Sequence, residues 1–472
     1  MTIHLVVACQ PRLRAYSFTR TYSAVNLILL FMKKKNAFPI LYPNAAGIDV
    51  ASKEHYVAVN PSVDEQPIRA FGCFTEDLHE IGRWLVKCRL DTVALEATGI
   101  YWVNLYLILE EYEINVVLVN AKHVKNVSGK KSDVKDAEWL RQLHSCGLLN
   151  ASFQPDAFTR KLRCYMRWRK DFTAMAATHI RLMQKAMEQM NIKLQHVITD
   201  ITGKTGQAII KAILQGERDA NALIQLVDGR TKASREDIIS SLAGIWREEH
   251  LFELQQSFDL YHIYRQRISE CDSHIQTHLK SKIQSEHTDE VATLKNRKNK
   301  NNLNFNATDI LRQITGTDLT EIFGITDTNA LEIISEVGLD MNKWPTVKHF
   351  TSWLNLAPNN KISGGKLLSS RTEKKKNRAG QIFKMAGFAV QRSNNSLAAF
   401  FQRVKAKSGS GKATMATARK IAVIFYLMIK RQTRFTPIPL EEYNSSFREQ
   451  QLRRITKNAK KMGFKLVPDI VT

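Results

Sequence analysis

Two aspartates, Asp133 and Asp136, lie three residues apart where the sequence predicts the start of a helix. At this spacing both side chains lie on one helix face, so their carboxylates can share a cation. The pair is also typical of an ordinary helix start, with Asp133 as the N-cap and Asp136 at the third helical position. Because Asp-x-x-Asp is a common pattern, the pair taken alone favours the capping interpretation.

Two further acidic residues, Asp49 and Glu96, change that balance. Asp49 lies within residues 45–60, whose alternating pattern predicts two strands around a turn at residues 52–54. Aspartate is a poor strand former, so Asp49 is either a hydrogen-bonded structural residue or a metal ligand. Glu96 follows a short apolar strand predicted over residues 91–95. The carboxyl end of a strand is where α/β folds place their chemistry.

The elements around these acids predict an α/β domain. A helix is expected over residues 75–89 and a β-branched strand over residues 114–119, followed by the acidic helix from Asp133. Four carboxylates on such a domain suit a pair of magnesium ions, because hard cations prefer oxygen ligands. Two ions about 4 Å apart can activate a nucleophile and stabilise the leaving oxygen during phosphodiester cleavage.

A second chemical candidate, Ser363, precedes Gly364-Gly365 in a predicted loop between two lysines. Glycines let a backbone approach a phosphate, and lysines offset its charge. A Ser-Gly-Gly turn is more often only a turn, so local features alone make Ser363 a weak candidate nucleophile. A basic run follows and would add phosphate contacts that are independent of sequence. The candidate nucleic-acid-binding residues here are Lys361, Lys366, Arg371, Lys374, Lys375, Lys376 and Arg378.

The charge balance of the chain indicates its class of partner. The 69 Lys and Arg exceed the 45 Asp and Glu, which gives a net charge of +24 at pH 7. A surplus of this size points to a polyanion, most commonly nucleic acid. Hydrophobic residues make up 44% and charged residues 24%, which is typical of globular proteins. A length of 472 residues predicts two or three domains.

The cysteines and the N-terminus indicate the compartment. The six cysteines show no Cys-x-x-Cys spacing and the 13 histidines do not cluster, so neither a zinc site nor a disulfide framework is expected. Reduced thiols are typical of a cytoplasmic protein. The apolar run 25–32 is too short to span a bilayer and no cleavage site follows it, so no membrane partner is expected. Residues 1–31 precede a second plausible start at Met32.

Helical periodicity dominates the rest of the chain. Apolar spacing predicts two long helices, Arg160–Leu194 and Glu248–Leu279, packed as a hairpin or coiled coil. They form either an oligomerisation arm or a helical domain that packs on itself. Residues 309–339 predict a helix, a Gly-containing turn and a helix, which resembles a phosphate-binding helix-hairpin-helix. Thr326 stands where that motif would have a second glycine, so a plain helical hairpin is the alternative.

The predicted organisation has six parts. They are a poorly ordered N-terminal extension (1–40), an α/β catalytic domain (41–157), a long-helix or coiled-coil region (158–294), a basic Asn-rich linker (295–307), a mainly helical domain carrying Ser363 (308–435) and a basic C-terminal tail (436–472).

Several of these segments together resemble the DEDD-type transposases of bacterial insertion sequences, family 110, which are described as bridge-RNA-guided recombinases. The resemblance extends over about residues 32–468. It is carried by GIDVASKEHYVAVN, ALEATGIYW, KSDVKDAEWL, WREEHLFELQQ, DMNKWPTVKHFTSWLNLAPNNKISGGK and EYNSSFREQQLRRITKNAKKMGFKLVP. Any one of these motifs alone would be unspecific, whereas together they are highly specific.

The resemblance implies a RuvC-like (RNase H fold) N-terminal domain, a helical coiled-coil insertion and a C-terminal transposase domain with a serine. The four acidic positions of the family match Asp49, Glu96, Asp133 and Asp136, and its serine matches Ser363. The acids are then expected to bind Mg²⁺, which Mn²⁺ could replace. Ser363 is expected to form a covalent link to DNA, which conserves the bond energy and makes a nucleotide cofactor unnecessary.

The resemblance also implies the partners. Donor and target DNA would be selected by base pairing with an element-encoded guide (bridge) RNA, so that the protein reads mainly backbone and shape. The expected assembly is a homo-oligomer in which dimers form a tetramer and each site combines the serine and acids of different subunits, in the bacterial cytoplasm at the nucleoid. Two alternatives are a hydrolytic RuvC-like nuclease, in which Ser363 is dispensable, and a non-catalytic nucleic-acid-binding scaffold.

Overall fold

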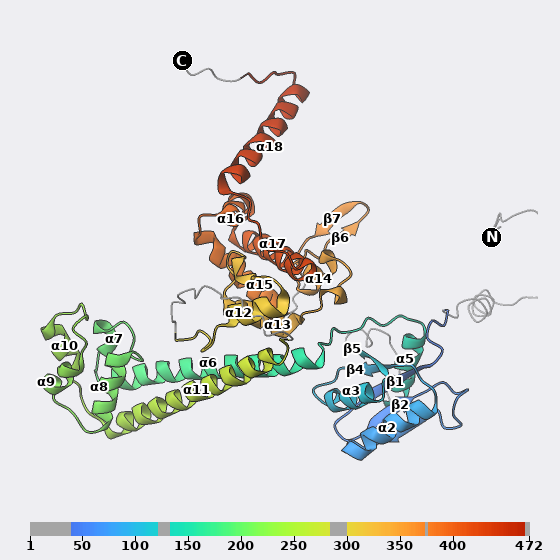
Figure 1. Cartoon of the computed structure of the whole chain (residues 1–472), viewed down its shortest axis with the longest axis horizontal. Helices are drawn as coiled ribbons and strands as arrows, with labels where there is room; N and C mark the ends of the chain where they lie inside the picture. Colours follow the sequence, from blue (N-terminus) through green and yellow to red (C-terminus); the bar gives the residue numbers. More distant parts are fainter. Residues whose placement is uncertain (1–38, 121–132, 284–299, 373–375, 468–472) are drawn as a thin grey trace, which may run out of the picture. The chain divides into compact units, whose positions relative to one another are not determined.

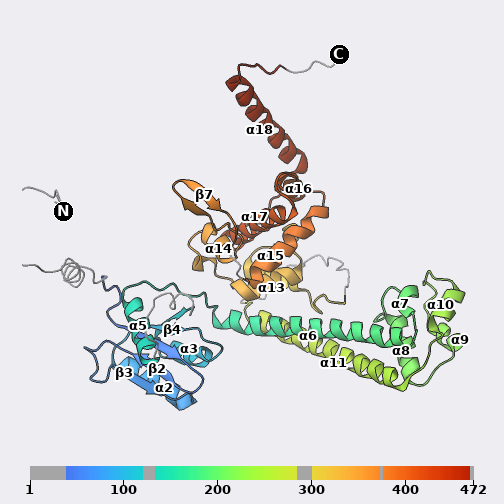
Figure 2. The same ribbon diagram turned by 180° about the vertical axis from the view of Figure 1, so that it is seen from behind.

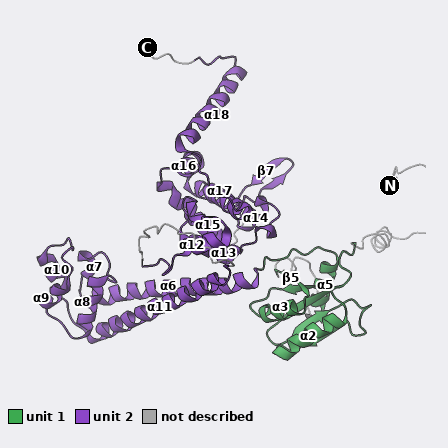
Figure 3. Cartoon of the chain, in the orientation of Figure 1, with its two compact units in different colours: residues 1–154 green, residues 155–472 purple. Residues whose placement is uncertain are grey.

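The computed structural model describes residues 39–120, 133–283, 300–372 and 376–467, without the side chains of residues 133 and 134. The chain forms two compact units, residues 1–154 (unit 1) and residues 155–472 (unit 2), which are coloured separately in Figure 3. Within the described ranges, no helix has both the length and the apolar character needed to cross a bilayer. The extension proposed for residues 1–40 lies almost entirely outside these ranges.

Unit 1 is built on one mixed sheet. Its strands are β1 (Ala45–Val50), β2 (His55–Ala58), β3 (Ile68–Phe71), β4 (Thr92–Glu96) and β5 (Asn115–Val119). Their order in the sheet is β3-β2-β1-β4-β5. Figure 1 labels β1, β2, β4 and β5. The first three strands pair antiparallel, and β4 pairs parallel with both β1 and β5. The predicted strands at 45–60, 91–95 and 114–119 are confirmed, whereas β3 was not predicted because its four residues are mostly part-exposed.

Helices cover both faces of this sheet. The helices of unit 1 are α2 (Thr75–Lys87), α3 (Trp102–Glu111) and α5 (Asp133–Ser145). One sheet face, which includes Ile48 and Leu95, packs against α2 and α3 in the main core of the unit. The other face carries Ala94 and Val119, which form a smaller apolar cluster with Leu140 of α5. Alternate residues of β1 and β4 therefore point to different helices, and the acidic helix has one sheet face to itself.

The first part of unit 2 is a pair of long helices, α6 (Ala157–Gln189) and α11 (Glu248–Lys280), which lie side by side in Figures 1 and 2. This confirms the two predicted long helices. Short helices connect them and share their apolar core. These are α7 (Leu194–Val197), α8 (Lys204–Leu214), α9 (Ala220–Leu223), the 3₁₀ helix η1 (Ile224–Leu226) and α10 (Arg235–Leu242).

The described part of the predicted linker is tied to this helix pair. Arg169 of α6 and Asp272 of α11 form an ion pair with Nε and Oδ1 2.5 Å apart, and their side chains are only 6% and 1% exposed. Arg169 also donates to the carbonyls of Asn301 and Asn302, and the amide of Asn304 donates to Asp272. Residues 301–304 are thus held against the helices by a buried charge, while residues 295–299 lie outside the described ranges.

The second part of unit 2 is mainly helical. Its elements are α12 (Ala307–Thr315), η2 (Leu319–Glu321), α13 (Asp327–Val337), η3 (Met341–Lys343), α14 (Val347–Trp353), β6 (Lys361–Ser363), β7 (Lys366–Ser369), α15 (Arg378–Ala389), η4 (Val390–Arg392), α16 (Ser396–Ser408), α17 (Ser410–Arg431) and α18 (Leu440–Lys461). One face of α17 is buried along its length against the helices around it, whereas α18 buries none of its residues. The mostly helical character predicted for this region is confirmed.

The turn between α12 and α13 explains why Thr326 replaces a glycine. Its side chain accepts a hydrogen bond from the amide of Asn329 and so caps α13. The glycine that the turn does require is Gly324, with a φ of +88°. A Cβ there would lie 2.6 Å from Val390 Cγ2. The predicted helix, turn and helix are present, and the turn packs closely on the end of α15.

Candidate active site

The acidic helix α5 touches the backbone of β1 at Gly47. A Cβ on Gly47 would lie 2.3 Å from the amide nitrogen of Arg141 and 2.4 Å from the carbonyl oxygen of Ala137. These are backbone atoms that cannot rotate away, so only glycine fits this position. The side of β1 toward which Gly47 faces is therefore the side covered by α5.

Hydrogen bonds at the end of α5 fix its direction. The carbonyl oxygen of Ser145 accepts from the amides of Leu41 and Tyr42, which precede β1, at 2.8 and 3.0 Å. The Nε2 of His144 lies 2.9 Å from Oγ1 of Thr92, the first residue of β4. The carboxyl end of α5 thus lies at the beginnings of β1 and β4. The helix runs antiparallel to both strands, and its start lies where the strands end.

This direction brings the two pairs of acids to one edge of the sheet. Asp49 lies two residues beyond Gly47 and Glu96 two residues beyond Ala94, so both side chains lie on the face covered by α5. Asp133 and Asp136 occupy the first turn of α5 at the same end of the strands.

Chain lengths agree with this placement. The eight residues from His144 back to Asp136 span about 12 Å of helix. The four residues from Thr92 to Glu96 span about 13 Å of strand. Because His144 is hydrogen-bonded to Thr92, Asp136 comes level with Glu96. In the parallel register Ile48 lies opposite Leu95, which makes Asp49 and Glu96 neighbours on adjacent strands.

The acids differ in their surroundings. Glu96 is 6% exposed and its Oε1 accepts a hydrogen bond from Oγ1 of Thr98 at 2.9 Å. Asp49 and Asp136 are partly buried, and the side chain of Asp133 lies outside the described part of the chain. Within the described part, no three His, Cys, Asp or Glu side chains lie close enough together to hold a metal ion as they stand.

An ion pair lies on α5 beside β1. Arg141, beside Gly47, makes two hydrogen bonds to the carboxylate of Glu138, at 2.8 and 2.6 Å. Burial of Glu138 opposes ionisation, but the hydrogen bonds from Arg141 and Gln142 outweigh it and lower the pKa of Glu138. Glu138 and Arg141 therefore neutralise each other on α5.

Ser363 ends β6 at the tip of an exposed hairpin. It pairs with Lys366 of β7, and the connecting Gly364 and Gly365 have φ values of +54° and +76°. Two consecutive positive φ values define the tight hairpin turn that favours glycine. The segment predicted to be a loop is thus a two-stranded hairpin. Its strands were not predicted because their residues are nearly all exposed and show no burial pattern. Among the described residues, no side chain hydrogen-bonds to the Ser363 hydroxyl.

The predicted nucleic-acid-binding residues lie on and after this hairpin. Those that the structure describes, all exposed, are Lys361, Lys366, Arg371, Lys376 and Arg378. Lys374 and Lys375 lie outside the described ranges. The acids belong to unit 1 and the serine with its cations belongs to unit 2.

The sequence analysis did not identify the residues that position α5 on the sheet or the hydrogen-bond partner of Glu96. Gly47 left a usable signal, because an isolated glycine within a strand pattern indicates a close approach of another backbone. The contact of Thr92 with His144 left none, because 52 residues separate the partners. Thr98 stands two residues after Glu96 and left no periodic signal either.

Comparison with known families supports the resemblance of the sequence motifs. A family model described as Transposase, of the DEDD type in the IS110 group, matches residues 46–192, which contain the four acids. A second model, described as Transposase IS116/IS110/IS902 family, matches residues 316–402, which contain Ser363. No curated protein matches the chain. Since the acid-bearing and serine-bearing segments match models of one family, the chain belongs to the IS110 family of transposases.

Proposed function

We propose that this transposase cuts and rejoins DNA strands for excision and integration of an insertion sequence, with Ser363 as the nucleophile and Asp49, Glu96, Asp133 and Asp136 as ligands of Mg²⁺. One observation carries the proposal: α5 packs antiparallel to β1 and β4, so its first turn lies near the ends of the strands that carry Asp49 and Glu96. The strand order, with three antiparallel strands and two parallel additions, supports a RuvC-like RNase H fold for unit 1.

The acids fit a divalent cation chemically. Glu96 is a buried carboxylate, and among the described residues no Lys, Arg or His forms an ion pair with it. A buried charge without a counter-charge is costly, and a bound cation would offset that cost. The four acids would hold Mg²⁺, which Mn²⁺ could replace. When bound, the metal would activate the attacking hydroxyl and stabilise the leaving oxygen.

The serine step conserves the energy of the phosphodiester. Oγ of Ser363 attacks phosphorus and loses its proton, an Oγ–P bond forms, and the P–O bond to the leaving strand end breaks as that oxygen takes up a proton. The hydroxyl of a second strand end then attacks the same phosphorus and releases Ser363. No nucleotide cofactor is needed. The exposure of Ser363 between Lys361 and Lys366 supports this role, because a strand can reach the hydroxyl while two cations contact its phosphates.

The partners follow from charge and exposure. A net charge of +24 suits the binding of donor DNA, target DNA and an element-encoded guide RNA, with sequence chosen by base pairing. Because Ser363 has no hydrogen-bonded base among the described residues, acids from a second subunit are proposed to complete each site. The long helices α6 and α11, as a coiled coil, would join dimers into a tetramer at the bacterial nucleoid.

A protein–DNA adduct that survives denaturation tests the proposal. The full-length protein is incubated with Mg²⁺, guide RNA and donor and target DNA, and the adduct is measured on a denaturing gel. We expect Ser363→Ala, Asp49→Asn and Asp136→Asn each to abolish adduct and recombinant product while RNA binding persists. Ser369→Ala, on the other strand of the same hairpin, is the matched control and should form the adduct.

The alternatives give different results. Appreciable recombination by Ser363→Ala would remove the covalent mechanism and favour a hydrolytic nuclease. A wild-type protein without metal-dependent cleavage, together with unchanged binding by Asp136→Asn, would favour a non-catalytic scaffold.

A further inference from the structure

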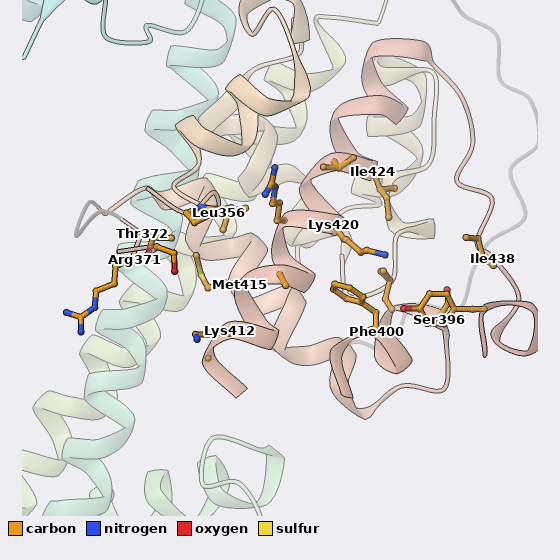
Figure 4. A pocket seen from close by; sticks show the side chains of 18 of the residues that line it. Leu356, Arg371, Thr372, Ser396, Phe400, Lys412, Met415, Lys420, Ile424 and Ile438 are labelled. Atoms are coloured by element: carbon orange, nitrogen blue, oxygen red, sulfur yellow. The ribbon is translucent and has the colours of Figure 1, made fainter. Parts of the chain in front are cut away.

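Unit 2 contains a large cavity beside the Ser363 hairpin. It measures about 1520 Å³ and is lined by residues of β7, α16, α17 and the start of α18. Figure 4 shows side chains of this lining, among them Phe400, Met415 and Lys420. Pockets for small molecules usually measure about 300–1,000 Å³, so this space, which we call the α17 cavity, is large for a single metabolite. Its apolar lining includes Leu356, Leu368, Phe400, Met415, Ile424 and Ile438.

The α17 cavity follows one face of a long helix. Its lining residues on α17 recur every three or four positions, from Lys412 through Met415 and Arg419 to Val423. The opposite face of α17, which includes Ile421 and Phe425, is buried in the core of the unit. The helix therefore has two apolar faces, and the second, mixed with cations, lines the cavity.

The cations that line the cavity have no acidic partner. They are Arg371, Lys412, Arg419 and Lys420, and none of them forms an ion pair with any residue that the structure describes. Like charges gathered along one wall repel one another unless an anion lies between them. The occupant that this wall suits is therefore anionic as well as partly apolar.

Aromatic rings stand beside these cations. Nζ of Lys420 lies 4.2 Å from the ring centre of Phe400, and Figure 4 shows the lysine extending toward that ring. The same Nζ lies 5.9 Å from the ring centre of Tyr443, another residue of the lining. Burial, and to a smaller extent the charge of Arg403, lowers the pKa of Lys420, so that an anion nearby would stabilise its charged form.

We propose that the α17 cavity binds unstacked nucleotides of a single nucleic-acid strand, with bases against Phe400 and the apolar wall and phosphates on Arg419 and Lys420. Aromatic rings interleaved with cations are the usual platform for single strands, because every base can stack and every linkage carries a charge. A hydrophobic protein segment would match the apolar wall and leave the cations unpaired.

The cavity also lies where the proposed function would need such a strand. Leu367 and Leu368 line it, and they directly follow Lys366, which pairs with Ser363. This step rests on the proposed function: a strand held in the cavity would run past the nucleophile. DNA and RNA strands share the required chemistry, and the experiment distinguishes them.

Binding to single-stranded oligonucleotides tests the proposal. Fluorescence anisotropy is measured for the full-length protein with matched DNA and RNA strands, and the tighter of the two identifies the source. We expect the double variant Arg419→Gln/Lys420→Gln to bind about tenfold more weakly. The matched control, Lys405→Gln/Lys407→Gln, removes two exposed charges of α16 outside the cavity and should change affinity less than about twofold. Equal losses in both variants, or no loss in the first, would overturn the proposal.

A crosslink on the unmodified protein avoids any question of folding. A strand substituted with 5-iodouracil is irradiated in the complex, and the crosslinked peptides are identified by mass spectrometry. Phe400 or Tyr443 should carry the crosslink, and its appearance only elsewhere would contradict the assignment. Ser363→Ala should give the same crosslink and the same affinity, so failure of the serine mechanism would not be mistaken for failure of this site.

Discussion

Asp49 and Glu96 stand on the central strands of a sheet that helices cover on both faces, whereas Ser363 ends one strand of an exposed two-stranded hairpin. The acids are placed by packing: a glycine contact and buried hydrogen bonds fix α5 over the strand ends. The serine is placed by its turn, through two glycines with positive φ. The difference suits the proposed chemistry, because ligands that share an ion need rigid support and a nucleophile needs access to its strand.

The largest effect is expected from a substitution that disrupts the packing of α5 against β1. Gly47→Val would push side-chain carbons into the backbone of Ala137 and Arg141, so α5 must move off the sheet. We expect unit 1 to lose about 3 kcal/mol of stability or more. Strand cleavage should fall at least about 100-fold, because the acids separate. Urea unfolding and the adduct assay measure these two effects.

Gly229→Ala is the control for this substitution, since no atom beyond its chain neighbours lies within 4 Å of a Cβ there. It should leave both stability and cleavage near the wild-type values. Normal cleavage by Gly47→Val would show that the packing of α5 against Gly47 does not position the acids.

Breaking the turn should separate activity from stability. Gly364→Val places a β-branched residue at a φ of +54°, which costs about 1–2 kcal/mol, confined to an exposed hairpin. We expect thermal unfolding to change little and adduct formation to fall about 100-fold, because Ser363 moves. Gly364→Asn should form the adduct normally, since Asn-Gly favours the same turn. Equal adduct yields from the Val and Asn variants would contradict a role for the turn.

A milder substitution tests whether Glu96 binds the metal ion. Thr98→Val removes the hydroxyl that donates to Glu96 and keeps the shape of the side chain. The Mg²⁺ concentration for half-maximal cleavage should rise about tenfold, as is usual when a partner of a metal ligand is lost. Thr98→Ser keeps the donor and should restore the wild-type requirement. A metal titration unchanged by Thr98→Val would indicate that Glu96 does not bind the ion.

The smallest expected effect is a pH dependence of the stability with which α5 packs on the sheet. The hydroxyl of Thr92 donates to the carbonyl of Asn115, so it must accept from a protonated Nε2 of neutral His144. Burial lowers the pKa of His144 below 6.5. The unfolded chain therefore binds a proton that the folded chain does not, and stability falls as the pH drops below 6.5.

Hydrogen exchange of the α5 peptide between pH 5 and 8, corrected for intrinsic rates, measures this dependence. The slope should not exceed about 1.4 kcal/mol per pH unit for one histidine. His144→Gln keeps an amide donor and should reduce the slope. Part of the dependence should remain, because burial also lowers the pKa of His55 on β2. An unchanged slope in the variant would exclude His144 as its source.

The local sequence pattern predicted helices and strands correctly where they bury most of their apolar residues. The pattern around Asp49 and the helical spacing of α6 and α11 predicted elements that the structure confirms. The two helices bury residues at helical spacing, and β1 is buried almost throughout. The local pattern failed for β3, which is short and half exposed, and for the hairpin of Ser363, which buries nothing. Thr326 was interpreted as a departure from a motif and proved to be a helix cap.

The sequence by itself determined which residues could do chemistry, because carboxylates, a hydroxyl and a surplus of cations are properties of composition. It also determined most of the elements that carry them. Only the tertiary structure decided that the two acidic segments meet, because the direction of α5 depends on contacts such as His144 with Thr92 and Arg141 with Gly47. Contacts between residues so far apart in the chain leave no local period in the sequence, and packing alone selects them.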